Sequence, residues 1–461
     1  MPEPLYAVSP LDGRYAGRTA PLREHVSEAA LMRARVEVEV EYLIALADVD
    51  AIDLTLDADE RETLRDLYGT FDRDDADLIK RLETDGYGEY PATNHDVKAV
   101  EYFIRLRLPD GFEAVGPWIH FGLTSEDVNN LAYRLLLDGA LREVLLPELL
   151  SVRNALAEMA REHRDLPMLA RTHGQPATPT TFGKEMAVFA ARLANAIAEV
   201  REATNALSGK LGGASGTYAA HVAAFPDVDW RAFAREFVAG LDLEFTPLTT
   251  QVNPCDDLAD LFDALRGAND VLLDLDVDMW LYVSDRYLGQ EATAGETGSS
   301  TMPHKVNPID FENGEGNLSK ANSDLTFLGD YVTKSRLQRD LSDSTVKRNV
   351  GVALSHCLIG YTKTGDGLAT VVPNEQVMRE DLDANPEVIG EAVQTILRRE
   401  GLDDAYERVK DLTRGQRTSL SDFRALFDDL DVDESVKDEL RALTPAGYTG
   451  VASDLVDELG D

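Results

Sequence analysis

The sequence predicts an all-α protein built around a central bundle of long helices. Three runs are long, rich in Ala and Leu and almost free of Pro, and they lie at 142–165, 183–208 and 256–284. Such runs exceed the usual globular helix and are typical of helical bundles. Strand-like segments are short and scattered. Alanine on several helix faces favours close packing in an oligomer; ordinary buried helices of a monomer are the alternative.

Glycine and proline divide this helical chain into three predicted domains. A further helix is expected over 23–47, where Ala, Val, Leu and Glu recur at helical spacing. Breaks near 108–111 and 365–367 predict domain boundaries, and the Gly-rich run 209–216 predicts a long loop inside the central domain. The predicted domains are an N-terminal helical domain at 1–112, a central long-helix bundle at 113–366 and an acidic C-terminal helical domain at 367–461.

The chain is strongly acidic. Asp and Glu total 84 of its 461 residues against 45 Lys and Arg, which gives a formal net charge of −39. A protein that binds nucleic acid normally carries the opposite charge. Because the acids are spread along the chain, we interpret them as a solvated acidic surface. We hypothesise that the protein works in a salt-rich cytoplasm, where a Debye length of roughly 3 Å at 1 M salt screens self-repulsion.

The remaining bulk features favour a cytoplasmic protein that needs no metal and no organic cofactor. No run of roughly 18 uncharged apolar residues occurs, so no membrane span is expected. The N-terminal residues 1–4 lack the basic and apolar regions of a signal peptide. Cys255 and Cys357 are too few for a disulfide framework or a Cys-rich zinc site. Walker, dinucleotide-binding and His-Glu-x-x-His motifs are not found in the sequence.

The most informative segment is 295–308, which reads Gly-Glu-Thr-Gly-Ser-Ser-Thr-Met-Pro-His-Lys-Val-Asn-Pro. Neither a helix nor a strand tolerates this order of glycines and prolines, so we expect a flexible, donor-rich loop that suits an anion. A serine is a poor base unless its alkoxide is stabilised, and glycine-flanked amides with Lys305 can supply that stabilisation. Ser299 and Ser300 are therefore candidate catalytic hydroxyls, although an isolated Ser-Ser is usually only a turn.

Two further motifs place a histidine beside a polar turn. The segment 171–177, Arg-Thr-His-Gly-Gln-Pro-Ala, contains His173. A group with a pKa near 6.5 suits proton donation to a leaving nitrogen, although a lone histidine is more often structural. The segment 93–102 carries His95 and Asp96 at the predicted start of a helix. Asp96 can cap this helix, and its N-terminus with His95 can face an anion.

Hydroxyl and arginine clusters complete the candidate residues. Thr124 and Ser125 precede a predicted helix, where either hydroxyl can cap the helix or bind a carboxylate. Arg14 and Tyr15 are presented by a predicted turn. Arginine suits phosphate and carboxylate groups, and surface salt bridges with the many acids are the alternative. A second basic cluster contains Arg336, Arg339, Ser344, Lys347 and Arg348.

Together these segments resemble the adenylosuccinate lyase family of the fumarase/aspartase superfamily. The loop at 295–308 alone resembles the whole superfamily. The narrower likeness covers nearly the whole chain, from Val8 to Leu459. It rests on Ser-Pro-Leu-Asp-Gly-Arg-Tyr at 9–15, Thr-Asn-His-Asp-Val-Lys-Ala-Val-Glu-Tyr at 93–102, Arg-Thr-His-Gly-Gln-Pro-Ala-Thr-Pro at 171–179, Val-Asn-Pro-Ile-Asp-Phe-Glu-Asn at 306–313 and Arg-Asp-Leu-Ser-Asp-Ser-Thr-Val at 339–346.

The resemblance implies an all-α, three-domain fold that assembles as a homotetramer with active sites shared between subunits. It implies two phosphorylated substrates of purine synthesis and no cofactor. Adenylosuccinate would give AMP and fumarate. The succinyl-carboxamide imidazole ribotide (SAICAR) would give the carboxamide (AICAR) and fumarate.

The resemblance also implies roles for individual residues. Ser299 would remove a proton beside a carboxylate, and His173, oriented by Glu312, would protonate the departing nitrogen. His95 would assist at the substrate, and Lys305 would help to stabilise the carbanion while the loop closes. The implied substrate-binding residues are Arg14, Tyr15, Asn94, His95, Asp96, Thr124, Ser125, Gln251, Ser300, Lys305, Val306, Asn307, Asn313, Arg339, Ser344, Thr345, Val346, Lys347 and Arg348.

Two other interpretations remain open at the level of sequence. One is a related lyase acting on argininosuccinate, aspartate or malate, which would not need all the arginines. The other is a non-catalytic protein on the same scaffold, which could have lost the acid and the base. The segment 83–91 departs from the family pattern by its length, and it alters the site entrance or only lengthens a surface loop.

Overall fold

The computed structural model describes residues 4–290, 306–413 and 418–460, and it divides into two compact units. Unit 1 contains Met1–Glu148, Ala196–Asp270 and Gly316–Gly360, and unit 2 contains Leu149–Asn195, Val271–Glu315 and Tyr361–Asp461. The division into three domains at 1–112, 113–366 and 367–461 stays a prediction. Residues of five long helices fall in both units: α7 (Leu146–Glu162), α8 (Phe182–Asn205), α11 (Asp256–Ser284), α12 (Ile309–Val332) and α14 (Val350–Thr370).

These long helices confirm the three predicted runs. The run 183–208 corresponds to α8, which ends three residues earlier at Asn205, and the run 256–284 matches α11. The run 142–165 begins in a π-helical turn (Ala140–Leu145) and continues as α7. In unit 1, the Asn269 amide of α11 donates to Asn322 of α12 at 2.9 Å and to the Cys357 sulfur of α14 at 3.4 Å. Buried polar contacts therefore join three of these helices.

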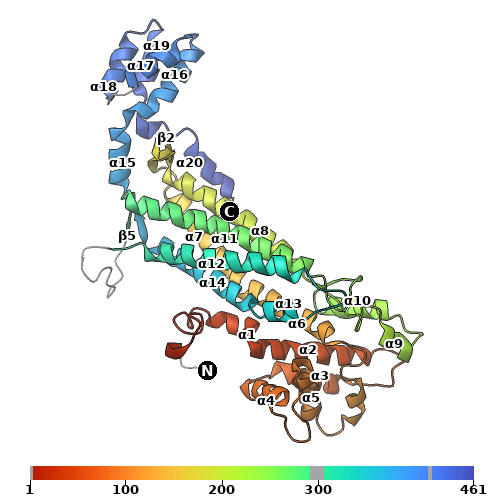
Figure 1. Ribbon diagram of the computed structural model, residues 1–461. Coiled ribbons are helices and arrows are strands. Elements are labelled where there is room, and N and C mark those ends of the chain that lie inside the picture. The colour runs from red at the N-terminus through yellow and green to blue at the C-terminus, as the bar shows by residue number, and fades with distance from the viewer. Residues whose placement is uncertain (1–3, 291–305, 414–417, 461) are drawn as a thin grey trace. The chain divides into compact units, whose positions relative to one another are not determined.

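Around α2 (Glu28–Leu46), unit 1 forms a second group of helices. Helix α2 packs against α3, α5 and α6, which Figure 1 shows gathered around it. The predicted helix at 23–47 is interrupted at Ser27, whose hydroxyl accepts from the Ala30 amide at 3.1 Å and starts α2. The other helices of this unit are α1 (Arg23–Val26), α3 (Ala58–Gly69), α4 (Arg73–Thr84), α5 (Asp96–Arg107), α6 (Ser125–Gly139), α9 (Ala219–Ala224), α10 (Trp230–Gly240), α13 (Ser342–Lys347) and the 3-10 helices Pro4–Tyr6, Ala20–Leu22 and Glu113–Trp118.

Unit 2 contains a small helical cluster with its own apolar core. Helices α16 to α19 lie together in Figure 1, and Val393, Leu397, Phe423 and Phe427 are buried among them. The helices of this unit are α15 (Glu375–Ala384), α16 (Gly390–Arg399), α17 (Ala405–Thr413), α18 (Leu420–Asp428), α19 (Glu434–Ala442), α20 (Ala452–Leu455) and the 3-10 helices Pro386–Ile389, Pro445–Gly447 and Val456–Leu459.

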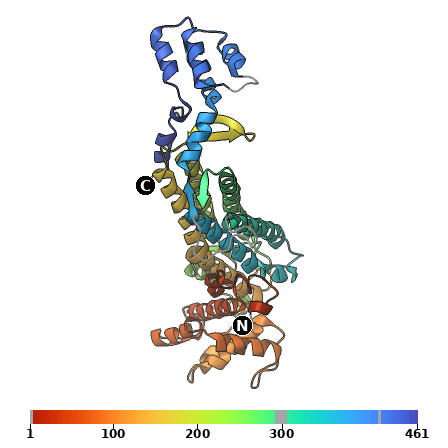
Figure 2. The same ribbon diagram turned by 90° about the vertical axis from the view of Figure 1, so that its left-hand side faces the viewer.

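The described strands form two-stranded pairs only. In unit 2, β1 (Pro167–Thr172) pairs antiparallel with β2 (Gln175–Thr181), and Figure 2 shows this hairpin beside α15. In the same unit, β5 (Leu288–Gln290) pairs antiparallel with β6 (Val371–Pro373). In unit 1, β3 (Ser208–Gly209) pairs parallel with β4 (Glu244–Phe245). Among the described residues, no helix combines the length and the apolar character that a membrane crossing requires.

The expected break at 365–367 is wrong, because α14 continues through it to Thr370. A Cβ on Gly367 would lie 2.7 Å from the Phe311 ring of α12, and one on Gly365 would lie 3.6 Å from Val152 of α7. Gly367 therefore allows close packing of α14 on α12 instead of opening a loop, whereas a side chain at position 365 would make an ordinary contact. The Gly-rich run after Gly209 is irregular up to Tyr218, as expected.

Candidate functional site

A cavity of about 280 Å³ in unit 1 is lined by eight of the predicted site residues. They come from the start of α5, the start of α6 and the segment around α13. These segments are far apart in sequence, so the fold brings together motifs that were identified separately. The eight residues are Asn94, His95, Asp96, Ser125, Arg339, Ser344, Lys347 and Arg348, and the lining is completed by Arg35, Glu83, Glu126, Asn129, Tyr133, Leu341 and Asp343.

His95, and not Asp96 as predicted, caps α5. Its Nδ1 accepts from the Lys98 amide at 3.2 Å. Because Nδ1 is an acceptor in this bond, the neutral imidazole carries its proton on Nε2. Half of the His95 side chain is exposed, so this N–H is available to a ligand in the cavity.

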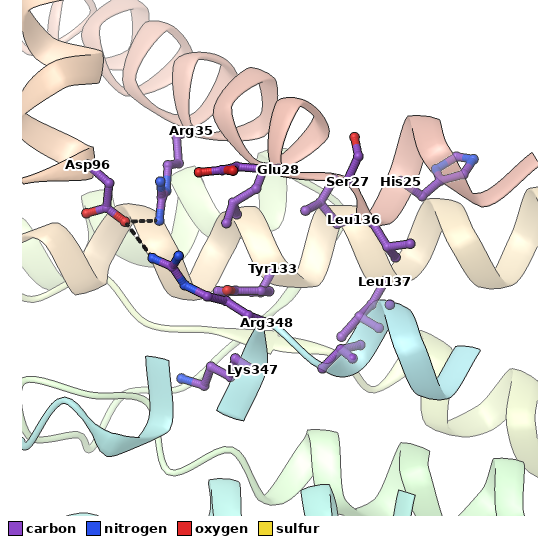
Figure 3. Close-up of a pocket in the computed structure, with 14 residues that line it drawn as sticks. His25, Ser27, Glu28, Arg35, Asp96, Tyr133, Leu136, Leu137, Lys347 and Arg348 are labelled. Carbon is purple, nitrogen blue, oxygen red and sulfur yellow. Dashed lines mark hydrogen bonds and ion pairs between the residues drawn. The ribbon is translucent and has the colours of Figure 1, made fainter. Parts of the chain in front are cut away.

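Asp96 is instead held between two arginines, as Figure 3 shows. Arg35 Nη2 lies 2.7 Å from Asp96 Oδ2, and Arg348 Nη2 lies 4.0 Å from the same oxygen. Burial alone would raise the pKa of Asp96, but the charge of Arg35 and the backbone N–H of Val97 lower it overall. Asp96 is therefore a carboxylate that is hydrogen-bonded by Arg35, and the guanidinium of Arg348 lies within ion-pair distance of it beside the cavity.

A second cavity, of about 210 Å³, adjoins the first along this arginine pair. Arg35, Asp96, Tyr133, Lys347 and Arg348 line both cavities. Figure 3 shows Leu136 and Leu137 on its other side, away from Asp96. The charged cavity therefore continues into a more apolar one within the same unit.

Arg339 is oriented by three neighbours. Its Nη1 donates to Gln251 Oε1 at 3.3 Å and to Ser125 Oγ at 3.5 Å. Its Nη2 lies 3.3 Å from the buried carboxylate of Glu126. The buried Arg339 Nε has no hydrogen-bond partner among the described residues. Since an unpaired buried donor is costly, this N–H is suited to an acceptor supplied by a ligand.

Glu126 also connects Arg339 to Lys347. The Lys347 ammonium is buried, 2.7 Å from Asp343 and 3.5 Å from Glu126. Four permanent cations and four carboxylates thus line the cavity, the carboxylates being Glu83, Asp96, Glu126 and Asp343. In a chain of net charge −39, this balance makes a locally neutral site. Arg348, whose side chain is 61% exposed, is the cation most accessible to an anionic ligand.

Six of the polar lining residues were not predicted as site residues: Arg35, Glu83, Glu126, Asn129, Tyr133 and Asp343. Arg35 lies in a helix rich in Val, Ala and Leu, and its sequence position alone does not indicate contact with Asp96. Glu126 and Asp343 lie inside motifs that were singled out, directly beside Ser125 and Ser344. Because Glu126 and Asp343 are adjacent to predicted ligand-binding residues, the sequence could have indicated that they also lie at the site.

Other predicted residues of unit 1 do not line this cavity within the described part of the chain. Thr124 is at the N-cap position of α6, where its amide donates to Asp127 at 2.9 Å. In the segment 83–91, Glu83 lines the cavity and Tyr87 pairs with Tyr90 in a tight turn. The residues outside the lining are Arg14, Tyr15, Thr124, Gln251, Thr345 and Val346.

Unit 2 carries His173 at the tip of the β1–β2 hairpin. His173 and Gly174 form its two-residue turn with φ of 53° and 70°, as in a type I′ turn. Glu312, in the first turn of α12, accepts from the Trp280 indole at 3.2 Å. No hydrogen bond or ion pair between His173 and Glu312 is present in the described part of unit 2, so the orientation of His173 by Glu312 stays a prediction.

The remaining predicted residues lie near or within 291–305. Ser299, Ser300 and Lys305 lie outside the described residues, so their roles stay predictions. Val306 is exposed, and the Asn307 carbonyl accepts from Gln290 at 3.4 Å. Asn313 donates to the Ile309 carbonyl at 2.8 Å within α12.

Comparison with known proteins agrees with the family that the motifs resemble. Residues 13–322 match the model of a lyase family, and residues 335–449 match that of the adenylosuccinate lyase C-terminal domain. The chain is 44% identical to adenylosuccinate lyases of Haemophilus influenzae and Escherichia coli, with 99% of both chains covered in each case. It is 44% identical to that of Dictyostelium discoideum, covering 98% of this chain and 97% of the relative.

Solved structures confirm the fold class. A fumarate lyase from Mesorhizobium sp. matches with a TM-score of 0.76 at 22% identity, covering 95% of this chain and 97% of the other. A 3-carboxy-cis,cis-muconate lactonizing enzyme from Pseudomonas putida matches with a TM-score of 0.74. The prediction of an all-α fold of the fumarase/aspartase type is therefore correct. By its full-length similarity to curated relatives, the chain belongs to the adenylosuccinate lyase family.

Proposed function

We propose that this enzyme eliminates fumarate from two phosphorylated succinyl compounds of purine synthesis. Adenylosuccinate yields AMP and fumarate, and SAICAR yields AICAR and fumarate. In each case a base removes the proton on the carbon beside one carboxylate. The electron pair forms the double bond of fumarate, the C–N bond breaks, and an acid protonates the departing nitrogen. No cofactor is required for these proton transfers.

Ser299 is the proposed base and His173 the proposed acid. The carbon acid is weak, so the developing aci-carboxylate needs donors, for which Lys305 and Asn307 are the candidates. Imidazole suits proton donation near neutral pH because its ordinary pKa is about 6.5. Placement of the two groups contributes much of the rate, since effective molarities reach roughly 10⁵ M or more. The choice of Ser299 over Ser300 rests on the family pattern.

The charged cavity in unit 1 is the observation that supports a phosphorylated, polyanionic substrate. It offers an exposed guanidinium on Arg348 and a buried donor on Arg339 Nε that has no partner among the described residues. Guanidinium groups bind phosphate and carboxylate through paired hydrogen bonds. A polyanionic substrate fits this donor set, and the names of the full-length relatives indicate adenylosuccinate.

The function is tested by following absorbance as fumarate is released from adenylosuccinate, SAICAR, malate and argininosuccinate. We expect activity on the first two only. Ser299→Ala and His173→Ala are each expected to lower kcat by at least about 10²-fold, the scale of general acid–base catalysis. Ser319→Ala, at an exposed serine on α12, is the matched control and should leave kcat unchanged.

Two outcomes would contradict these assignments separately. Release of fumarate from malate or argininosuccinate, without activity on adenylosuccinate, would identify a related lyase. If the wild type is active on adenylosuccinate but either Ala variant turns over at a near-normal rate, the substrate assignment stands. The catalytic role proposed for the substituted residue is then refuted.

The proposal extends to assembly and location. The enzyme is a homotetramer that completes its active sites with residues of several subunits, and it works in the cytoplasm. Sedimentation should give a mass about four times the 50.7 kDa of one chain. Both Ala variants should keep that mass, because neither substitution removes apolar packing. A monomeric species with full activity would contradict the shared sites.

A further inference from the structure

The tip of the His173 hairpin has little packing of its own. Its base is buried at Met168, Leu169 and Thr181, whereas residues 171–176 are exposed. A two-stranded hairpin is at best marginally stable alone, and a positive φ at a non-glycine residue such as His173 is unfavourable. The direction of the imidazole therefore depends on what holds the tip.

Arg171, two residues before His173, provides a side-chain anchor for the tip. Its Nη2 donates to Asp381 Oδ2 of α15 at 2.7 Å, and its Nε lies 3.5 Å from Asp285. Arg171 also pairs across the hairpin with Pro176. A contact that fixes the Arg171 guanidinium thus restrains both sides of the two-residue turn that carries His173.

The Asp381 carboxylate is itself held by neighbours within unit 2. The Tyr287 hydroxyl donates to the same Oδ2 that receives Arg171, and the Asn385 amide donates to Oδ1 at 3.2 Å. The Tyr287 side chain is buried, and its carbonyl accepts from the Asn374 amide at 2.7 Å. Burial raises the pKa of Tyr287, so its phenol remains a donor at neutral pH.

We propose that Asp381 and Tyr287 are positioning residues for the elimination, which orient His173 through Arg171. Tyr287 fixes the carboxylate, the carboxylate fixes the guanidinium, and the guanidinium fixes the hairpin tip. Neither residue touches the substrate. This inference rests on the proposed function, in which His173 protonates the departing nitrogen, and it adds two residues that the motifs did not indicate.

Asp381→Asn and Tyr287→Phe test the proposal, since each keeps the side-chain shape and weakens one link. We expect kcat on adenylosuccinate to fall about 10- to 100-fold, the scale of a small misplacement of a catalytic group. KM should stay within about twofold, because the substrate-binding cavity of unit 1 is unchanged. Asp383→Asn, at an exposed aspartate on the same helix, is the matched control and should keep wild-type kcat.

A double-mutant cycle separates positioning from general damage. Arg171→Ala and Asp381→Ala should each lower kcat, and the double variant should be no slower than the slower single variant, because both remove one contact. If the losses of kcat in the two single variants add up in the double variant, the proposal is overturned. The same holds if the single variants keep wild-type kcat or only raise KM. If Asp381→Asn lowers Tm strongly, its loss of kcat is not informative. Tyr287→Phe then tests the positioning role, because it leaves the ion pair between Arg171 and Asp381 in place.

His173→Ala, measured in the same assay, separates the proposed acid role of His173 from the proposed positioning role of Asp381 and Tyr287. An inactive His173→Ala enzyme with a fully active Asp381→Asn enzyme would refute only the positioning role. An active His173→Ala enzyme would refute the proposed acid, and the positioning role would fall with it.

Discussion

At the scale of single residues, two carboxylates of the cavity each pair with two cations: the half-buried Asp96 and the buried Glu126. Asp96 holds Arg35 and Arg348, and Glu126 holds Arg339 and Lys347. Each carboxylate contacts at least one side chain that is predicted to bind an anionic substrate. In a chain with so many acids, a binding site for an anion depends on such local pairing, because unpaired acids nearby would repel the ligand.

Asp276, on α11, is a buried carboxyl without a cationic partner. Its Oδ2 accepts from the Thr364 hydroxyl at 3.1 Å, and its Oδ1 has no partner among the described residues. Burial raises its pKa to about 8, and the charge of Glu315 acts in the same direction. The group is therefore mostly protonated near pH 7 in the folded chain, whereas it is ionised in the unfolded chain.

We predict that Asp276→Asn stabilises the protein increasingly as pH rises. The folded-state pKa is above the ordinary value of 3.8, so the folded chain binds the extra proton between these two values. Ionisation of Asp276 should therefore lower the free energy of unfolding of the wild type by up to about 1.4 kcal/mol for each unit that the pH rises. An asparagine does not ionise, so the variant does not lose this stability. Thermal unfolding at pH 5 and pH 8 should show a larger Tm gain for the variant at pH 8.

The control is Asp260→Asn, at an exposed position of the same helix, which removes one carboxylate charge without changing the surroundings of Asp276. An Asp276→Asn variant with the same Tm difference at both pH values would show that Asp276 is not protonated in the folded chain.

At the scale of the element, helical glycines in this fold have different functions. Gly183, at the start of α8, faces the backbone of the last turn of α7 and of the residues after it: an added Cβ would lie 2.4 Å from the Ala160 carbonyl oxygen and 2.6 Å from the Arg164 Cα. Gly316, inside α12, has no atom within 4 Å of the corresponding position. The same residue type thus permits close backbone approach in one helix and only lowers helix propensity in the other.

We predict that two matched glycine-to-alanine substitutions change the free energy of unfolding in opposite directions. Gly183→Ala should destabilise by at least about 1–3 kcal/mol, because the clash is with backbone that cannot rotate away. Gly316→Ala should stabilise by about 0.4–1 kcal/mol through the lower entropy of the unfolded chain. Chemical or thermal unfolding of both variants checks the pair, and equal effects would contradict the close approach at Gly183.

The same contrast explains which elements could be predicted from the sequence. The long helices follow from local periodicity, so 183–208 and 256–284 were placed correctly. The break at 365–367 was wrong because the role of Gly367 depends on contact with Phe311, which is remote in sequence. Breaker residues are ambiguous until the neighbouring helix is known.

The site shows the same limit. Motif chemistry identified His95, Ser125 and Arg339, and the structure brings them to one cavity. The cap of α5 was assigned to Asp96, but Arg35 binds that carboxylate and His95 takes the cap instead. The pairing of residues 35 and 96 is tertiary, so no local pattern encodes it.

At the scale of the whole molecule, net charge is the dominant feature. The chain carries 84 acids against 45 bases, so many acids have no basic partner available within the chain. Some exposed bases already contact several acids, as Arg441 does with Asp428, Glu434 and Asp438. Exposed pairs of this kind contribute little to stability, because water and salt screen them. The acids in excess of the bases repel one another, and this repulsion opposes the compact folded state.

We predict that KCl raises the melting temperature at neutral pH. The Debye length falls from about 10 Å at 0.1 M to about 3 Å at 1 M, which screens repulsion between neighbouring surface acids. Melting curves from dilute buffer to molar KCl test this, and chloride is preferred because sulfate stabilises proteins by exclusion from the surface. The gain should shrink at pH 5, where part of the carboxylates are protonated. A Tm that is constant or falls with KCl at neutral pH would refute adaptation to a salt-rich cytoplasm.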